Sequence, residues 1–416
     1  MSEAIDRTPV FQDSDPATVP LDLIEIWRPD RFENNTFWPY FARLRKDDPV
    51  HYTPESPYGP FWSVTKFDDI MHVDTHHEIF SSEGGITIED DDPEFELPMF
   101  IAMDPPKHDL QRKTVSGVVA PMNLAKLEGT IRERAGRILD SLPVGETINW
   151  VDKVSIELTA QMLATLFDFP FEDRRKLTYW SDMAVADASS GLYESVDHQR
   201  AELLACLEYF TRLWNERVNK TDGNDLITML ANGESTKNMP PMEYLGNLIL
   251  LIVGGNDTTR NSISGGVLAL NQNPNEYAKL RANPSLIPNM VSEIIRWQTP
   301  LSHMRRRALS DTELRGKKIK KGDKVVMWYV SGNRDEEAID NPDAFIIDRP
   351  KARQHLSFGF GIHRCMGNRL AEMQLRVVWE EILKRFSTVE VVAEPTRVRS
   401  NFIKGYSNLP VRLHRV

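Results

Sequence analysis

The sequence predicts a mainly helical protein with small β-sheets at one side. Seven long segments space their apolar residues as helices do, strand-like runs are confined to a few short stretches, and strands and helices do not alternate as in βαβ units. With 416 residues, 41% of them hydrophobic and 27% charged, the chain can bury a large core. Since no linker or repeat divides it, we expect one domain over residues 1–416, with residues 1–35 as a loosely structured extension.

The expected elements follow in chain order. The stretch FWPYFARLRK at 37–46 has a helical rhythm, and residues 49–64 are typical of a hairpin around a Pro/Gly turn. An acidic run at 89–92 predicts a solvated loop. Strand-like material returns at 312–330 and again from Thr388 onward. After the proline pair at 105–106 the chain becomes mostly helical, and the expected helices are 107–119, 124–142, 151–169, 197–220, 241–272, 285–297 and 368–386.

Composition excludes several classes of protein. Two cysteines, Cys206 and Cys365, cannot form a disulfide framework or a four-cysteine zinc site. The net charge of −11 argues against nucleic acid or an anionic membrane as the partner of the surface at large. The most apolar run, 248–253, is far shorter than the roughly 20 residues of a membrane span. Residues 1–20 lack a signal-peptide pattern, so we expect a cytoplasmic protein with no membrane span.

The most informative stretch is HLSFGFGIHRCMG at 355–367, which delivers Cys365 immediately before a predicted helix. The N–H groups and dipole at a helix N-terminus would stabilise a thiolate, and glycines let the backbone approach the sulfur. A lone thiolate is a nucleophile or a metal ligand, and a haem fits this loop better than zinc does. Cys206, by contrast, lies at helical spacing among apolar residues and is expected to pack in the core.

The second stretch, LILLIVGGNDTT at 248–259, lies in the longest predicted helix. Each interior glycine costs about 1 kcal/mol relative to alanine, so Gly254 and Gly255 need a reason. Close approach of a flat ligand is one, and tight helix packing with Thr258 bonded back to a carbonyl is the other. Asp257 and Thr258 form a plausible proton-delivery pair.

Further charged residues are less specific one by one. Glu293 and Arg296 share a helix face, which by itself indicates only an ion pair. Several bases could bind carboxylates or phosphates, and the default interpretation of each is an exposed charge: His108, Arg112, Arg305, Arg306, Arg307, His355 and His363.

Together these residues resemble the cytochromes P450. The Cys-loop pattern FxxGxxxCxG is met at Phe358, Gly361, Cys365 and Gly367. The long-helix pattern [AG]Gx[DE]T[TS] is met at Gly254, Gly255, Asp257, Thr258 and Thr259, and the ExxR pair at Glu293 and Arg296. The segments DPPKHDLQR at 104–112 and GNRD at 332–335 also look like family segments, so the resemblance covers nearly the whole chain from about residue 35.

The resemblance implies the P450 fold, with haem b between the long glycine-bearing helix and the Cys365 loop. Cys365 would be the axial ligand of the iron, and Glu293 and Arg296 would be structural. The implied haem contacts are Gly254, Gly255, Phe358, Gly361, Gly367, His108, Arg112, Arg306, His355 and His363. Of these, His363 stands where many members have arginine, and Arg306 aligns best within the run 305–307.

The implied activity is a monooxygenase that uses O2 on a hydrophobic substrate, with protons delivered through Thr258 and Asp257. More narrowly, LLIVGGNDTTRNSISGG, VSEIIRWQTPLSHMRR and HRCMGNRLAEMQL resemble the bacterial P450s that hydroxylate alkanes and fatty acids at the terminal carbon. Residues 183–198 would form a mobile lid. The candidate substrate contacts, for which core packing is the alternative, are Leu250, Val253, Leu301, Met304 and Phe402.

Electrons must come from outside, because no GxGxxG fingerprint for a flavin or nicotinamide occurs. The resemblance implies a ferredoxin with its NAD(P)H reductase, docking near Arg364, Arg369, Arg376 and Lys384. Three alternatives stay open: a hydroxylase of a terpene or sterol side chain, a peroxide-using relative, and a haem-binding sensor without turnover.

Overall fold

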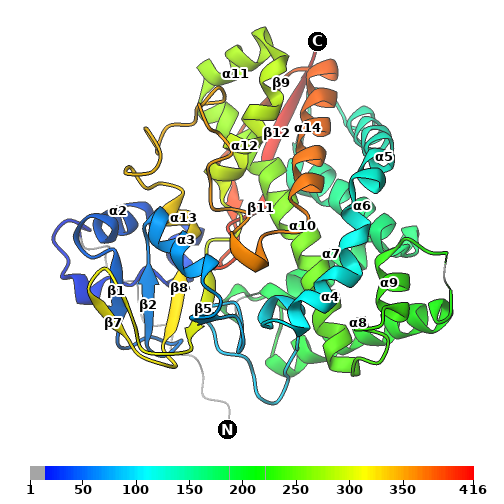
Figure 1. Cartoon of the computed structure of the whole chain (residues 1–416). Coiled ribbons are helices and arrows are strands. Elements are labelled where there is room, and N and C mark those ends of the chain that lie inside the picture. The colour runs from blue at the N-terminus through cyan, green and yellow to red at the C-terminus, as the bar shows by residue number, and fades with distance from the viewer. Residues whose placement is uncertain (1–14, 187, 221) are drawn as a thin grey trace.

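The computed structural model describes residues 15–186, 188–220 and 222–416, and in it a mainly helical part adjoins a smaller β-rich part (Figure 1). The helices are α1 (Pro29–Glu33), α2 (Trp38–Asp47), α3 (Phe67–Thr75), α4 (Lys107–Ser116), α5 (Pro121–Asp140), α6 (Glu157–Phe167), α7 (Arg175–Val185), α8 (Val196–Arg217), α9 (Leu226–Asn232), α10 (Pro241–Gln272), α11 (Pro274–Ala282), α12 (Ile287–Gln298), α13 (Tyr329–Gly332) and α14 (Asn368–Arg385). The strands are β1 (Val50–Thr53), β2 (Phe61–Val64), β3 (Phe80–Ser81), β4 (Thr147–Asn149), β5 (Met304–Ala308), β6 (Thr312–Leu314), β7 (Lys317–Ile319), β8 (Lys324–Met327), β9 (Phe386–Val391), β10 (Thr396–Arg397), β11 (Tyr406–Asn408) and β12 (Pro410–Arg415).

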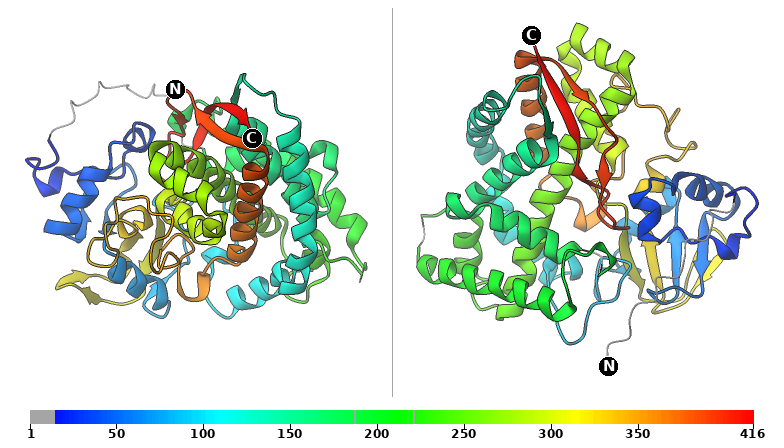
Figure 2. Two further views of the ribbon diagram at one scale, coloured as in Figure 1. Left: turned by 90° about the horizontal axis from the view of Figure 1, so that it is seen from above. Right: turned by 180° about the vertical axis from the view of Figure 1, so that it is seen from behind.

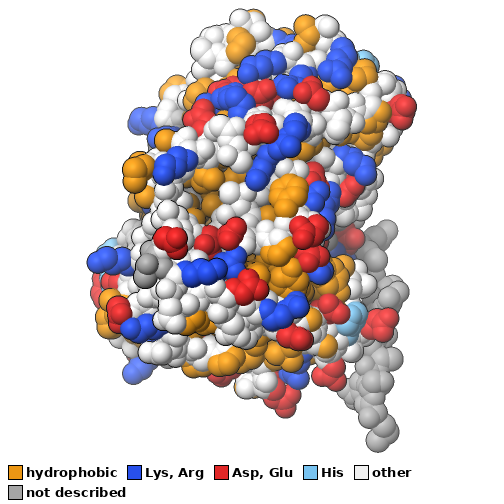
Figure 3. Space-filling view, turned by 90° about the vertical axis from the view of Figure 1, so that its right-hand side faces the viewer, with side chains coloured by type: hydrophobic (Ala, Val, Ile, Leu, Met, Phe, Trp, Pro, Cys, Tyr) orange, Lys and Arg blue, Asp and Glu red, His pale blue; other side chains and the backbone are white. Residues whose placement is uncertain are grey.

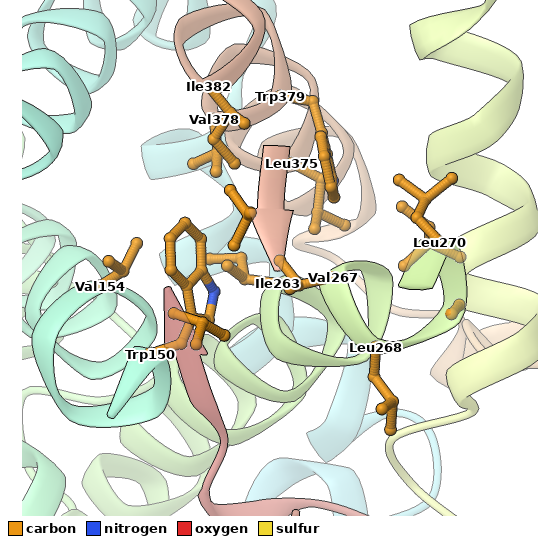
Figure 4. Packing of buried hydrophobic residues seen from close by; sticks show 14 of the residues in the cluster. Trp150, Val154, Ile263, Val267, Leu268, Leu270, Leu375, Val378, Trp379 and Ile382 are labelled. Carbon is orange, nitrogen blue, oxygen red and sulfur yellow. The ribbon is translucent and has the colours of Figure 1, made fainter. Parts of the chain in front are cut away.

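Helix α10 passes through the centre of the helical part (Figure 1). It starts with Pro241 at a position that needs no N–H donor, and it ends before Pro274, which also opens α11. Its C-terminal half packs Ile263 and Val267 against α14, in a buried cluster that also contains Trp150 (Figure 4). This packing fixes α10 relative to α14, the helix that follows Cys365.

The main sheet joins distant parts of the chain. Its strand order is β1-β2-β8-β5-β3, with β2 parallel to β8 and the other pairs antiparallel. Trp62 is opposite Val325 in the parallel pair. A second sheet, β4-β12-β9, lies by the C-terminus (Figure 2). Near the N-terminus, helix α1 contacts the short strand β10.

The fold class predicted from the sequence is confirmed, and the seven expected helices are all present with small shifts at their ends. The segment expected at 151–169 starts as a π-helix over Val151–Ile156 before α6. Six helices were not expected: α1, α3, α7, α9, α11 and α13. Within the described residues, no helix is both long enough and apolar enough to cross a membrane.

The expected extension falls partly outside the described residues, since residues 1–14 are not among them. From residue 15 onward the chain already contributes to the fold. Ile24, Ile26 and Phe32 are buried in an apolar cluster with Trp328. The packed part of the chain therefore begins before residue 35, because these three side chains complete the cover of the main sheet.

Candidate active site

Cys365 ends a loop that turns back on itself before α14. Its backbone N–H donates to the carbonyl oxygen of Phe358 at 2.8 Å. Gly361 has a φ of +64°, and a Cβ at this position would collide with the carbonyl oxygen of Asp74. Only glycine fits such a position. The turn therefore holds Cys365 in one place.

Cys365 faces a cavity of about 430 Å³ between its own loop and α10. Binding sites for small molecules have volumes of roughly 300–1,000 Å³, so this cavity is large enough to be one. Most of the side chains that line it are apolar. All five residues that the sequence suggested as substrate contacts are among them: Leu250, Val253, Leu301, Met304 and Phe402.

The electrostatics at Cys365 differ from the sequence argument. Burial raises the pKa of its thiol, and this effect outweighs the N–H groups of Gly367 and Asn368 and the guanidinium of Arg112, which lower it. The N–H groups at the start of α14 thus act in the direction that the sequence argument gave, but they do not offset burial by themselves. A metal ion deprotonates a thiol that coordinates it, so this sulfur suits a metal ligand better than a free nucleophile.

The two glycines of α10 have different surroundings. A Cβ at Gly254 would have no heavy atom within 4 Å, apart from those of its chain neighbours and of its own helix backbone. The same holds for Gly367, which lies close to the cysteine. Gly255 instead packs on α6, because a Cβ there would lie 2.8 Å from the Leu163 side chain. Gly254 thus leaves room for a flat ligand, whereas Gly255 also lines the cavity but packs closely on α6.

The basic residues near the sulfur have unsatisfied ring atoms. Arg112, Arg306 and His363 line the cavity, and neither ring nitrogen of His363 has a hydrogen-bond partner within the described residues. His108 packs behind His363, with ring centroids 4.3 Å apart, and its Nε2 is likewise buried without a partner. His355 Nδ1 is also buried without a partner, but His355 is not among the residues that line the cavity.

Buried polar atoms need partners, and the two propionates of haem b are acceptors of suitable charge. Burial lowers the pKa of His363 to about 2 and that of His355 to about 3, so both rings are neutral at pH 7. A neutral imidazole still donates one N–H. The room at Gly254 and these unpaired atoms fit haem b. When bound, this group supplies the activation of O2.

Only one arginine of the run 305–307 lines the cavity, as far as the described residues show. Arg306 does so while it forms a buried ion pair with Asp74 at 2.7 Å. Arg305 is buried against the loop at 85–90, where it pairs with Asp90 at 2.6 Å, and Arg307 is exposed. Of the three, Arg306 is thus placed to reach a propionate.

The proposed proton-delivery pair is divided between two sides of α10. Thr258 lines the cavity and donates its hydroxyl proton to the carbonyl oxygen of Gly254 at 2.9 Å. Asp257 is fully buried behind the helix, where it accepts a hydrogen bond from Ser181 of α7 at 2.6 Å and pairs with Arg260. Burial raises the pKa of the Asp257 carboxyl even though Arg260 lowers it.

Glu293 and Arg296 lie outside the cavity and are completely buried. Two hydrogen bonds of 2.8 Å join them, and Arg349 adds a second guanidinium to Glu293 at 3.1 Å. Arg296 also donates to the carbonyl oxygens of Asn333 and Pro342. The pair therefore fastens the segment after α13 to α12 and has no contact with the reacting groups.

Sequence reasoning did not find His303, which joins three segments of the cavity wall. Its Nε2 accepts a hydrogen bond from the Ile88 N–H at 3.0 Å, and its Nδ1 donates to the Asn401 carbonyl oxygen at 3.0 Å. The ring also lies 5.3 Å from Phe402. No motif marks this residue, because its partners are backbone atoms far away in the sequence.

The fold and the site define a haem-thiolate enzyme: one cysteine faces an apolar cavity, and Arg112, Arg306 and His363, which can hold propionates, line the same cavity. A family model described as "Cytochrome P450" matches residues 190–404. The linalool 8-monooxygenase of Pseudomonas putida is 36% identical, with 94% of this chain and 98% of the relative covered. The methyl-branched lipid omega-hydroxylase of Mycobacterium bovis is 34% identical, with 89% and 90% covered. Cytochrome P450-153 from Novosphingobium aromaticivorans has a solved structure that is 49% identical with a TM-score of 0.89, covering 94% of this chain and 99% of that one.

The chain belongs to the cytochrome P450 family. It is a P450 monooxygenase with haem b as its cofactor, and it needs O2, a hydrophobic substrate and a redox partner.

Proposed function

We propose that this enzyme hydroxylates the terminal carbon of medium-chain linear alkanes or fatty acids, as one haem domain in the cytoplasm. The observation that carries the proposal is the apolar wall of the cavity facing Cys365. A terminal C–H bond is stronger than its neighbours, so the wall must restrict which carbon comes near the reacting centre. The omega-hydroxylase among the relatives supports the same regioselectivity.

Residues on three sides of the cavity suit this restriction. Leu250 and Val253 lie on α10, Leu301 and Met304 follow α12, and Phe402 lies in the C-terminal loop. Thr299 ends α12 in a left-handed conformation with φ 42°, and Pro300 then turns the chain toward the cavity. The five side chains therefore come from three separate segments of the chain.

The charges of the wall favour an uncharged substrate. Among the described residues that line the cavity, the cations are Arg112 and Arg306, and we assign both, together with the neutral His363, to the haem propionates. The remaining charged lining residues are Asp74, Asp91 and Asp92. Asp74 pairs with Arg306, and Asp92 pairs with Arg200. No cation of the described wall is therefore left for a fatty-acid carboxylate, so alkanes should bind more tightly than fatty acids of equal length.

We assign proton delivery to Thr258 and Asp257, and haem binding to the bases named above together with the loop glycines. Thr258 can present its hydroxyl to the cavity, because it lies on the cavity side of α10. Asp257 contacts α7 rather than the cavity. If Asp257 delivers protons, each proton must therefore move from the α7 side of α10 to the cavity side.

We propose a ferredoxin as the electron donor, with its NAD(P)H reductase. Two of the four suggested contacts are already paired, since Arg376 binds Glu128 and Glu380 and Lys384 binds Glu381. Arg364 and Arg369 are exposed next to Cys365 and have no acidic partner within the described residues. On the right-hand side of the molecule in Figure 1, basic and acidic side chains are interspersed (Figure 3). Arg364 and Arg369 are therefore the better candidates for an acidic partner.

A spin-state titration tests the substrate assignment. The holoenzyme is titrated with octane, octanoate, linalool and cholesterol, and products are identified after turnover with a ferredoxin and its reductase. We expect octane to shift the haem spectrum at lower concentration than octanoate and to yield 1-octanol. A shift only with linalool or cholesterol, or oxidation of octane mainly at inner carbons, would contradict the proposal.

A further inference from the structure

A second cleft, of about 240 Å³, lies where α2 and α12 meet the C-terminal strands, and it shares no described lining residue with the haem cavity. Three of its lining residues are basic, namely Arg334, Arg397 and Lys404, and two are the tryptophans Trp38 and Trp297. We call these five residues the basic cleft. The P450 function does not use them.

The basic cleft has more positive charge than its own acids can balance. Asp343 is the acidic lining residue within the described chain, and it lies 3.8 Å from Arg334 with a side chain that is 83% exposed. Arg397 has no ion pair among the described residues. Burial and the neighbouring cations hold the pKa of Lys404 well below its usual value, and burial lowers that of Arg334 to about 9. An anion in the cleft would offset this repulsion.

Aromatic rings hold two of these cations in place. The Arg334 guanidinium carbon lies 3.8 Å from the ring centroid of Trp297 and 4.7 Å from that of Trp38. Lys404 Nζ lies 5.5 Å from the Trp38 ring centroid and donates to the Gln298 carbonyl oxygen at 2.7 Å. Contacts of this kind fix a cation over a ring face. Since an ammonium has three N–H donors, Lys404 retains two for a ligand.

We propose that the basic cleft is a second ligand site, which binds a small aromatic carboxylate with its carboxylate on Lys404 and Arg397 and its ring against Trp38. The volume of the cleft supports a small ligand, because about 240 Å³ is below the roughly 300–1,000 Å³ of sites that bind larger molecules. Trp38 is only partly buried and offers apolar surface beside the two cations, which favours a ligand with an aromatic ring over a simple inorganic anion.

Calorimetric titration of the holoenzyme with benzoate at low ionic strength tests this site. We expect one saturable site whose Kd rises about tenfold or more in Lys404→Met and in Arg397→Gln, since each removes a charge-assisted hydrogen bond. Arg397 lies on the short strand β10, so its variant keeps the test valid if Lys404→Met does not fold. The control is Lys318→Met on the exposed side of β7, which should bind benzoate like the wild type.

Acetate and inorganic phosphate are titrated in parallel, and the haem spectrum is recorded throughout. Weaker binding of both, with an unchanged haem spectrum, supports an aromatic carboxylate site outside the haem cavity. The proposal is overturned if the wild type shows no saturable heat, if acetate or phosphate binds as tightly as benzoate, or if all variants have the same Kd. It is also overturned if benzoate shifts the haem spectrum over the same concentration range as the heat, and if Lys404→Met changes neither the shift nor the heat.

Discussion

His303 provides a stability test that can be worked out from the structure. Its ring is completely buried, both nitrogens are bonded to backbone groups, and burial lowers its pKa to about 3. An unfolded histidine has a pKa of about 6.5. Between these two pH values the unfolded chain binds one more proton than the native protein does. The contribution of His303 to stability is therefore fully present above about pH 6.5 and is lost as the pH falls toward the native pKa. The cost at pH 5, relative to pH 7.5, is about 2 kcal/mol for this one residue.

Urea unfolding of the holoenzyme at pH 7.5 and at pH 5 measures this cost in the wild type and in His303→Gln, whose amide can accept from Ile88 and donate to Asn401. Other buried histidines also contribute to the wild-type pH slope, so the informative quantity is the difference between the two proteins. We expect the difference in unfolding free energy to change by about 2 kcal/mol between the two pH values. His77→Gln is the control for removing a histidine outside the core. If the wild type and His303→Gln differ in unfolding free energy by the same amount at both pH values, the assignment of a neutral, buried His303 is refuted.

Three further predictions concern the haem site and its support. Gly254→Val should lower the haem content of the purified protein, because the new side chain enters the space left for the cofactor; full haem occupancy, measured by absorbance, would contradict this. Glu293→Gln should destabilise the protein by about 3–5 kcal/mol in urea unfolding, because the charges of Arg296 and Arg349 lose their partner; a loss below 1 kcal/mol would show that the ion pairs are not needed. Thr258→Ala should raise NAD(P)H consumption per product formed, because proton delivery is impaired; unchanged coupling would remove this residue from the pathway.

Periodic sequence patterns were enough for the long helices and for the order of the elements. Helix α10 was placed correctly at both ends because prolines mark its start and its end. Helix α7 was missed, and with it Ser181, which bonds to the buried Asp257. Its sequence RKLTYWSDMAV mixes polar and apolar residues, and its helical form depends on packing against α10 and α8.

The motifs located the haem site, whereas interactions between distant backbone segments could not be read from the sequence. The Cys365 loop and the glycine pair carry short-range patterns that show where they lie. The bonds of His303 to Ile88 and Asn401, and of Arg349 to Glu293, join residues 56 to 215 positions apart. No local spacing rule encodes such pairs, so only the folded structure shows them.

The parallel pairing of β2 with β8 has a consequence for synthesis of the chain. Trp62 cannot meet Val325 until the ribosome has made about 260 more residues, which takes roughly 13–50 s at 5–20 residues per second. During that time the hairpin β1-β2 exposes the edge of β2 with which β8 later pairs, and its apolar side chains lack their later partners in the cluster, such as Val325 and Met327. Nascent chains that contain β2 but not yet β8 should therefore depend on chaperones. The β-rich part should be the last to fold, even though it contains the first strands to be made.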